Sequence, residues 1–138
     1  MADNLSDDLR DNSYVAPSVI HGTLSFKIVG CAQRVHSKLG PGFPEGVYQK
    51  ALCVELAKKG IPFVCEKLAE VHYDGVLCGE FRMDLVVDDK IVLELKALDA
   101  IHPTHTAQAL SYLKATGLKL AIILNFGQER LKSERVVR

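Results

Sequence analysis

Apolar residues recur along this chain at two spacings, and the change from one to the other separates helical from extended segments. Over residues 23–39 and 44–59 they recur every three or four positions, which is the period of a helix with one buried face. In the second segment the apolar positions are Val47, Ala51, Val54 and Leu56. A third helix is predicted over residues 104–116, ahead of a glycine.

The region between the second and third helices has short apolar runs typical of β-strands, and two more runs follow the third helix. Asp74-Gly75 is a strong two-residue hairpin signal, and residues 88–90 predict a second turn. The third helix then carries the chain across to a parallel strand. This order predicts an α/β sandwich built on a mixed sheet. The predicted strands span residues 61–66, 69–73, 76–81, 83–87, 91–97, 120–125 and 130–137.

The N-terminal segment differs in composition from the rest of the chain. Residues 1–17 are polar and aperiodic, so we expect a disordered acidic tail followed by one folded domain over residues 18–138. The sequence begins without a basic region followed by an apolar run, which predicts no signal peptide. No apolar stretch approaches the ~18 residues of a membrane span. We therefore expect a cytoplasmic protein with no membrane partner.

Charge and cysteine content narrow the possible functions only slightly. The 138 residues include 17 basic and 17 acidic side chains, so the formal net charge of zero gives no global sign of a nucleic-acid partner. The four cysteines contain no Cys-x-x-Cys pair, which argues against a zinc or iron–sulfur site. We expect them to be buried thiols in a reducing compartment. They are Cys31, Cys53, Cys65 and Cys78.

The chemistry that stands out lies in the two strands joined by the turn at residues 88–90. Side chains alternate between the faces of a strand, so Glu94 and Lys96 share one side, and a three-residue turn places Asp84 directly opposite Glu94. Two carboxylates in apolar strands repel each other, so one must be protonated or a cation must lie between them. Oxygen ligands beside a lysine suit Mg²⁺. A salt-bridged patch on a half-exposed sheet face explains the same spacing, and three positions alone do not decide between the two.

Several motifs in one order resemble those of a known family. The Asp-x9-Glu-x-Lys arrangement is similar to that of the PD-(D/E)xK nuclease superfamily, and residues 42–48, Gly-Phe-Pro-Glu-Gly-Val-Tyr, match the motif that names the GxxExxY protein family, a small branch of it. Met83 stands where the superfamily label has a proline beside the aspartate. The resemblance spans about residues 25–137. It implies a single-domain restriction-endonuclease-like sandwich, with a mixed central sheet flanked by helices.

The resemblance also implies roles for individual residues. Asp84 and Glu94 correspond to metal-binding acids for Mg²⁺ or Mn²⁺, and Lys96 corresponds to the catalytic lysine. Glu45 is similar to an upstream helical glutamate that completes the metal shell and so belongs to the catalytic set. Its alternative role is to interact with the dipole at the start of its helix.

A second group of residues is assigned to substrate binding. Gln108 and Tyr112 match the QxxxY motif of nucleases resembling the RecB nuclease domain, where such residues shape the site and contact DNA. Their alternative is a helix-face hydrogen bond and a packing aromatic. His105 lines the site or contacts phosphate, and Lys114 is a candidate phosphate contact. Tyr48 either orients Glu45 or is a core tyrosine with its hydroxyl at the rim.

The leading hypothesis is a metal-dependent phosphodiesterase, a nuclease that hydrolyses the DNA backbone with a metal-activated water. A homodimer is expected because small nuclease cores of this kind commonly dimerise. The alternative is a non-catalytic module that keeps the nuclease fold for nucleic-acid binding or protein interaction. A third possibility is a hydrolase of small phosphoesters, which would need no polymeric substrate.

Overall fold

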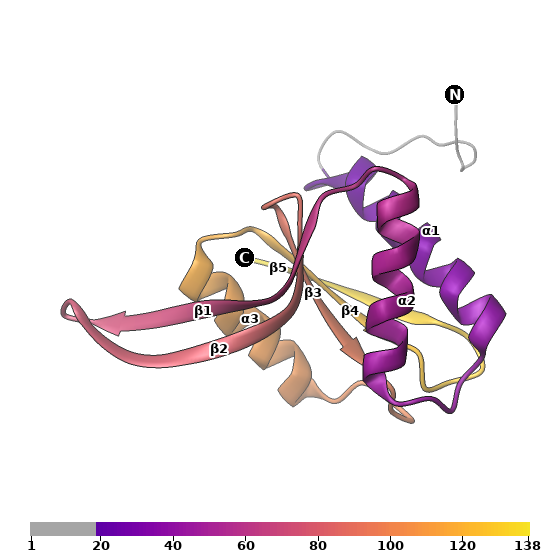
Figure 1. The fold of residues 1–138 in the computed structure, drawn as a ribbon. Coiled ribbons are helices and arrows are strands. Elements are labelled where there is room, and N and C mark those ends of the chain that lie inside the picture. The colour runs from indigo at the N-terminus through magenta and orange to yellow at the C-terminus, as the bar shows by residue number, and fades with distance from the viewer. Residues whose placement is uncertain (1–18) are drawn as a thin grey trace.

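The structure, a computed structural model, describes residues 19–138 as three helices and a five-stranded sheet (Figure 1). The expected tail at residues 1–17 lies outside the described residues. No helix in the described part of the chain is long and apolar enough to cross a membrane. The elements are α1 (Gly22–Leu39), α2 (Glu45–Lys58), β1 (Phe63–Tyr73), β2 (Val76–Val87), β3 (Ile91–Lys96), α3 (Pro103–Thr116), β4 (Leu120–Asn125) and β5 (Lys132–Val137).

The sheet is mixed, as the sequence predicts. Its strands follow one another in chain order, and only β3 and β4 pair in parallel, through the crossover that contains α3. A parallel pair requires such a long connection, whereas the tight turns of the other strands give antiparallel pairs. The α/β fold class is therefore confirmed.

Two predicted breaks in the strands are absent. The four strands expected between residues 61 and 87 form two long strands, β1 and β2, because Lys67 pairs with Met83 and Leu68 with Arg82 at the expected gaps. The hairpin turn at Asp74-Gly75 is present, with both residues at positive φ, as a type I′ turn requires. This hairpin extends well beyond the rest of the sheet (Figure 1).

Helices cover the two faces of the sheet, with α1 and α2 on one face and α3 on the other (Figure 1). The buried apolar residues of α2 are Tyr48, Leu52 and Leu56, spaced four residues apart. Val47 and Val54, expected among them, are 38% and 54% exposed. The assignment was wrong because several faces of α2 hold apolar residues and only packing against α1 and the sheet selects one.

The prediction that all four cysteines are buried is also wrong. Only Cys31 is buried, Cys53 is partly buried, and Cys65 and Cys78 are exposed. Both exposed thiols lie on the β1–β2 hairpin, where no helix covers one face along much of its length.

Candidate active site

Asp84 and Glu94 come together on the face of the sheet that α3 covers. Three residues separate β2 from β3, so Val87 pairs with Ile91 and Leu85 with Leu93, as predicted. Just beyond this register, Asp84 lies beside Glu94, since its side chain accepts a hydrogen bond from the Leu95 amide and its charge raises the pKa of Glu94. Val92 belongs to the apolar cluster beneath α3, whereas Leu93 and Leu95 belong to the cluster beneath α1 and α2. Strand alternation therefore places Glu94 and Lys96 on the α3 face.

The main chain bends where Asp84 enters the site. Met83 and Val86 both contact the α3 cluster although they are three residues apart, so the regular alternation of β2 is interrupted between them. On the neighbouring strand, Cys65 and Lys67 are paired with β2 but Glu66 between them is not, and its φ is 54°. Glu66 thus lies opposite Asp84 in a left-handed conformation that is uncommon for a non-glycine residue.

Glu94 is the most perturbed acid of the site. The residue is only 4% exposed, and its Oε2 has no hydrogen-bond partner among the described residues. Burial, followed by the negative charge of Asp84, raises the pKa of Glu94 to about 8, against the opposing effect of Lys96. An uncompensated carboxylate in this position is costly, so the geometry favours either a proton or a cation at Glu94.

Asp84 is held in place by the main chain of the adjacent strand. The Leu95 amide donates a hydrogen bond to Asp84 Oδ2 at 2.8 Å. Burial raises the pKa of Asp84, while that hydrogen bond and the Lys96 ammonium act in the opposite direction. Glu66 raises the Asp84 pKa further. One carboxylate oxygen of Asp84 is therefore fixed, and the acid pair is oriented before any ligand arrives.

The end of β3, which carries Lys96, is anchored by a buried asparagine. Asn125 Oδ1 accepts hydrogen bonds from the amides of Leu98 and Gly127, and its Nδ2 donates to the Leu98 carbonyl at 3.0 Å. A side chain at Gly127 would collide with the backbone of Ala97 and Leu98. The close approach of these two segments fixes the chain directly after Lys96 and explains the glycine.

Glu45 begins α2 and is exposed, but it interacts electrostatically with the site. It raises the pKa of both Glu94 and His105. Among residues 19–138, however, no three His, Cys, Asp or Glu side chains lie close enough together to hold a metal ion. The structure therefore brings Asp84 and Glu94 together without closing a three-carboxylate shell around Glu45.

Tyr48 is a core tyrosine, which was one of its two predicted roles. Its ring stacks on Phe126 with centroids 4.6 Å apart. Its hydroxyl donates to the Gly40 carbonyl at 2.6 Å and accepts from the Phe43 amide at 3.1 Å. Tyr48 thus fixes the loop that leads into Glu45, and contributes to the site by positioning that loop.

Among the assigned substrate-binding residues, Tyr112 has the clearest link to the acid pair. It is buried, and burial together with the charges of Glu94 and Asp84 raises its pKa to about 12. Gln108, one turn earlier, is exposed on the same helix. Lys114 is exposed near the end of α3.

Two histidines at the start of α3, His102 and His105, have a structural role that was not predicted. The His105 Nδ1 accepts a hydrogen bond from the His102 amide at 3.0 Å, and the His102 ring accepts one from the Thr104 amide, which together form a capping box. Burial and the Lys96 charge, the two leading causes, lower the pKa of His105. His105 therefore caps α3 and also lies within electrostatic reach of Lys96.

Two further residues near the site were not predicted. Gln49 Nε2 donates to the Asp84 carbonyl at 3.2 Å, linking α2 to the bend of β2. Its position one turn after Glu45 was the available signal. Arg82 binds Glu66 at 3.2 Å, beside Asp84. No sequence pattern indicated the left-handed Glu66.

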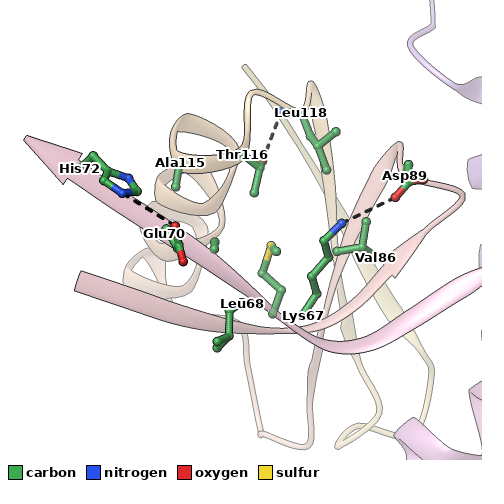
Figure 2. A pocket seen from close by; sticks show the side chains of 11 residues that line it. Lys67, Leu68, Glu70, His72, Val86, Asp89, Ala115, Thr116 and Leu118 are labelled. Carbon is green, nitrogen blue, oxygen red and sulfur yellow. Dashed lines mark hydrogen bonds and ion pairs between the residues drawn. The ribbon is translucent and has the colours of Figure 1, made fainter. Parts of the chain in front are cut away.

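A groove separates the β1–β2 hairpin from α3 (Figure 2). Its volume is about 490 Å³, and Lys67 reaches Asp89 along one wall while His72 lies beside Glu70. A second hollow of about 540 Å³ continues along the hairpin, lined in part by Phe81, Ser111 and Lys114. Phe81 also contacts the Tyr112 ring at 5.7 Å between centroids, so the groove adjoins the acid pair through this aromatic contact.

The mixed sheet with an acid pair and a lysine at the bend of two strands defines a nuclease-like α/β protein. The family model of the PD-(D/E)XK nuclease superfamily matches residues 22–138, and the chain belongs to this superfamily. Among solved structures, an alkaline exonuclease (LHK-Exo) from Laribacter hongkongensis is similar in fold, with a TM-score of 0.50 and 12% sequence identity. The match covers 90% of this chain and 72% of that one. No curated protein sequence matches the chain.

Nucleases of this superfamily generally use divalent metal ions. The residues present fit such an ion, because Glu94 Oε2 is buried beside a second carboxylate and has no partner among residues 19–138. Oxygen-only donors are the ligands that Mg²⁺ and Mn²⁺ prefer.

Proposed function

We propose that this protein is a metal-dependent phosphodiesterase that hydrolyses the backbone of nucleic acid, with DNA as its substrate, and that it belongs to the GxxExxY branch of its superfamily. The observation that supports this most strongly is the unpartnered Glu94 Oε2, buried next to Asp84 and on the same sheet face as Lys96. A purely structural salt-bridged patch would leave no buried carboxylate oxygen without a partner.

Asp84 and Glu94 would hold the divalent ion, with Glu45 approaching from the start of α2 when substrate is bound. The bound ion supplies an activated water at neutral pH and neutralises charge on the phosphate. Mg²⁺ commonly keeps several waters and uses one or two carboxylates together with substrate phosphates. Two close carboxylates are therefore a sufficient protein contribution, and a third is not required.

The chain's own groups then complete the chemistry. The Lys96 ammonium lies on the same face as Glu94 and stabilises negative charge that develops on the phosphate. Tyr112 stays protonated at neutral pH, since its pKa is about 12, and can donate a hydrogen bond into the site. Gln49 holds the β2 bend against α2, which keeps Asp84 oriented. Gln108 and Lys114 extend along α3 as contacts for the nucleic-acid backbone.

The test begins with calorimetric titration of Mn²⁺ into the wild type and into Asp84→Asn and Glu94→Gln variants. Both substitutions keep the shape of the side chain, and we expect each to abolish saturable binding. Lys96→Ala should still bind Mn²⁺ but should lose cleavage of a plasmid and of labelled single- and double-stranded oligonucleotides. RNA and a small-molecule phosphodiester serve as alternative substrates. Circular dichroism confirms that each variant is folded.

Two outcomes of this experiment would contradict the proposal. If well-folded wild type binds no Mn²⁺ with or without DNA, the catalytic proposal is wrong and a non-catalytic module with a nuclease fold remains. If metal binds and only the small ester is cleaved, the polymer substrate is wrong while the site stands.

A further inference from the structure

Two thiols from different elements, twelve positions apart in the sequence, meet beside the site. Cys53 lies on α2 and Cys65 on β1, and their sulfur atoms are 3.3 Å apart. Cys53 is partly buried, whereas Cys65 is exposed. A disulfide has a sulfur–sulfur distance of about 2.05 Å, so the two atoms need to approach by only a little over ~1 Å.

Cys53 lies one helical turn from a residue that contacts Asp84, and Cys65 lies next to a residue opposite Asp84. Cys53 follows Gln49 by one helical turn, and Gln49 donates to the Asp84 carbonyl. Cys65 pairs with Leu85 and immediately precedes Glu66, the left-handed residue opposite Asp84. A covalent link between the two sulfurs would therefore tie α2 to the hairpin at the bend that presents Asp84.

We propose that Cys53 and Cys65 form a redox modification site, which a peroxide converts into an intramolecular disulfide joining α2 to β1. Cys65, the exposed thiol, reacts first. Its sulfur attacks one peroxide oxygen, an S–O bond forms, the O–O bond breaks, and the leaving hydroxide takes up a proton to give water. The Cys53 sulfur then attacks the Cys65 sulfur of this sulfenic acid. The S–S bond forms as the S–O bond breaks, and the second hydroxide leaves as water with the Cys53 proton.

With hydrogen peroxide as the oxidant, two thiols and one peroxide give one disulfide and two waters, with the sulfur pair losing two electrons. The order of events follows from the surroundings of each thiol. Burial, followed by the hydrogen bond with Cys65, raises the pKa of Cys53 to about 12. Cys53 therefore stays protonated, so the exposed Cys65 reacts first and the attack of Cys53 on the sulfenic acid is slow.

The remaining two cysteines provide natural controls. Cys31 lies on α1 and is fully buried in the core that α1 and α2 form with the sheet. Cys78 is exposed on the hairpin like Cys65, but its sulfur contacts the Val76 carbonyl rather than another sulfur. Cys78 should reach the sulfenic acid and then continue to higher oxidation states, because no thiol lies within reach to resolve it.

The experiment treats folded full-length protein with hydrogen peroxide, quenches free thiols with iodoacetamide, and measures intact mass and non-reduced tryptic peptides. Cleavage at lysine places the two cysteines on separate peptides, residues 51–58 and 60–67. The mass of Cys78→Ser should fall by two hydrogen atoms, wild type should in addition gain oxygen at Cys78, and both should yield these peptides joined. Cys53→Ser should show no joined peptide and should accumulate a dimedone adduct at Cys65.

A second measurement separates a native link from a random one. Oxidation should raise the melting temperature of Cys78→Ser by several degrees, and dithiothreitol should reverse this, because the link restricts the unfolded chain. Joined peptides that appear only when oxidation is done in denaturant, or a Cys65 that is oxidised equally to sulfinic acid with and without Cys53, would overturn the proposal.

Discussion

The buried carboxyl of Glu94 should make the stability of the metal-free protein fall as the pH rises. The group has an ordinary pKa of 4.5, and burial together with Asp84 raises it to about 8 in the folded protein. Between these two values the folded protein keeps a proton on Glu94 that the unfolded chain has lost. The free energy of unfolding therefore decreases with increasing pH across this window, and the effect is absent below the unfolded pKa.

Replacing Glu94 with glutamine removes this titration while preserving the shape of the side chain. One protonation difference changes the free energy of unfolding by about 1.4 kcal/mol per pH unit. Over the interval from 4.5 to about 8 this amounts to a ceiling of roughly 5 kcal/mol. Small domains are stable by only about 5–15 kcal/mol, so the difference should be large enough to measure by urea unfolding.

The assay compares wild type and Glu94→Gln by urea denaturation at pH 5, 6, 7, 8 and 9 with EDTA present. The two should be similar near pH 5, and the variant should become progressively more stable as the pH rises to 8. Glu80→Gln, the same substitution at an exposed position of the hairpin, should parallel the wild type. Parallel curves for Glu94→Gln and wild type across the whole range would show that the carboxylate is not destabilised in the fold, and the reasoning would fail.

Three other substitutions, with Gly30→Ala as a control for the first, test how the site is held, and each is measured by urea unfolding. Gly127→Ala should lower the free energy of unfolding by at least about 1–3 kcal/mol, because the new methyl group collides with the main chain after β3. Gly30 lies in open space on α1, so Gly30→Ala should leave the free energy of unfolding unchanged or raise it by up to about 1 kcal/mol. Tyr48→Phe should cost about 1–3 kcal/mol through two lost hydrogen bonds. Gln49→Ala should cost about 1 kcal/mol, and should weaken Mn²⁺ binding in calorimetry by releasing the bend at Asp84.

The acid pair could be predicted from the sequence because it depends on local geometry alone. Strand alternation and a three-residue turn determine which side chains face each other, and both features can be read from residues 81–97. The parallel pairing of β3 with β4 was predictable for a similar reason, since the intervening segment is long enough for a crossover helix.

Other features depend on contacts between segments distant in the chain, and no local pattern encodes them. The buried face of α2 was misassigned because Val47 and Val54 are as apolar as the residues that α1 and the sheet select. The capping box at His102 and His105 is a local feature, but histidine is not among the usual capping residues, so the sequence did not indicate it. The hydrogen bond from Gln49 to Asp84 joins elements 35 positions apart in the sequence.

The position of the strained backbone in β1 supports a functional role for the bend of β2 at Asp84. Five non-glycine residues of the described chain have positive φ, and four of them lie at a helix cap or in the turns after β1 and β2. Those positions accept left-handed residues for reasons of turn geometry. Glu66 alone lies within a strand, where the conformation costs roughly 1–3 kcal/mol without shaping a turn.

The backbone strain at Glu66 lies at the same place as a second destabilising feature, the buried carboxyl of Glu94. Glu66 stands opposite Asp84, and Asp84 stands beside the unpartnered Glu94. Either feature by itself has an ordinary structural explanation, but a strained backbone and a destabilised acid at one bend of the sheet weaken the fold twice in the same location. A cation between the two carboxylates would offset the electrostatic part. That benefit does not exist for a sheet face that only holds the domain together.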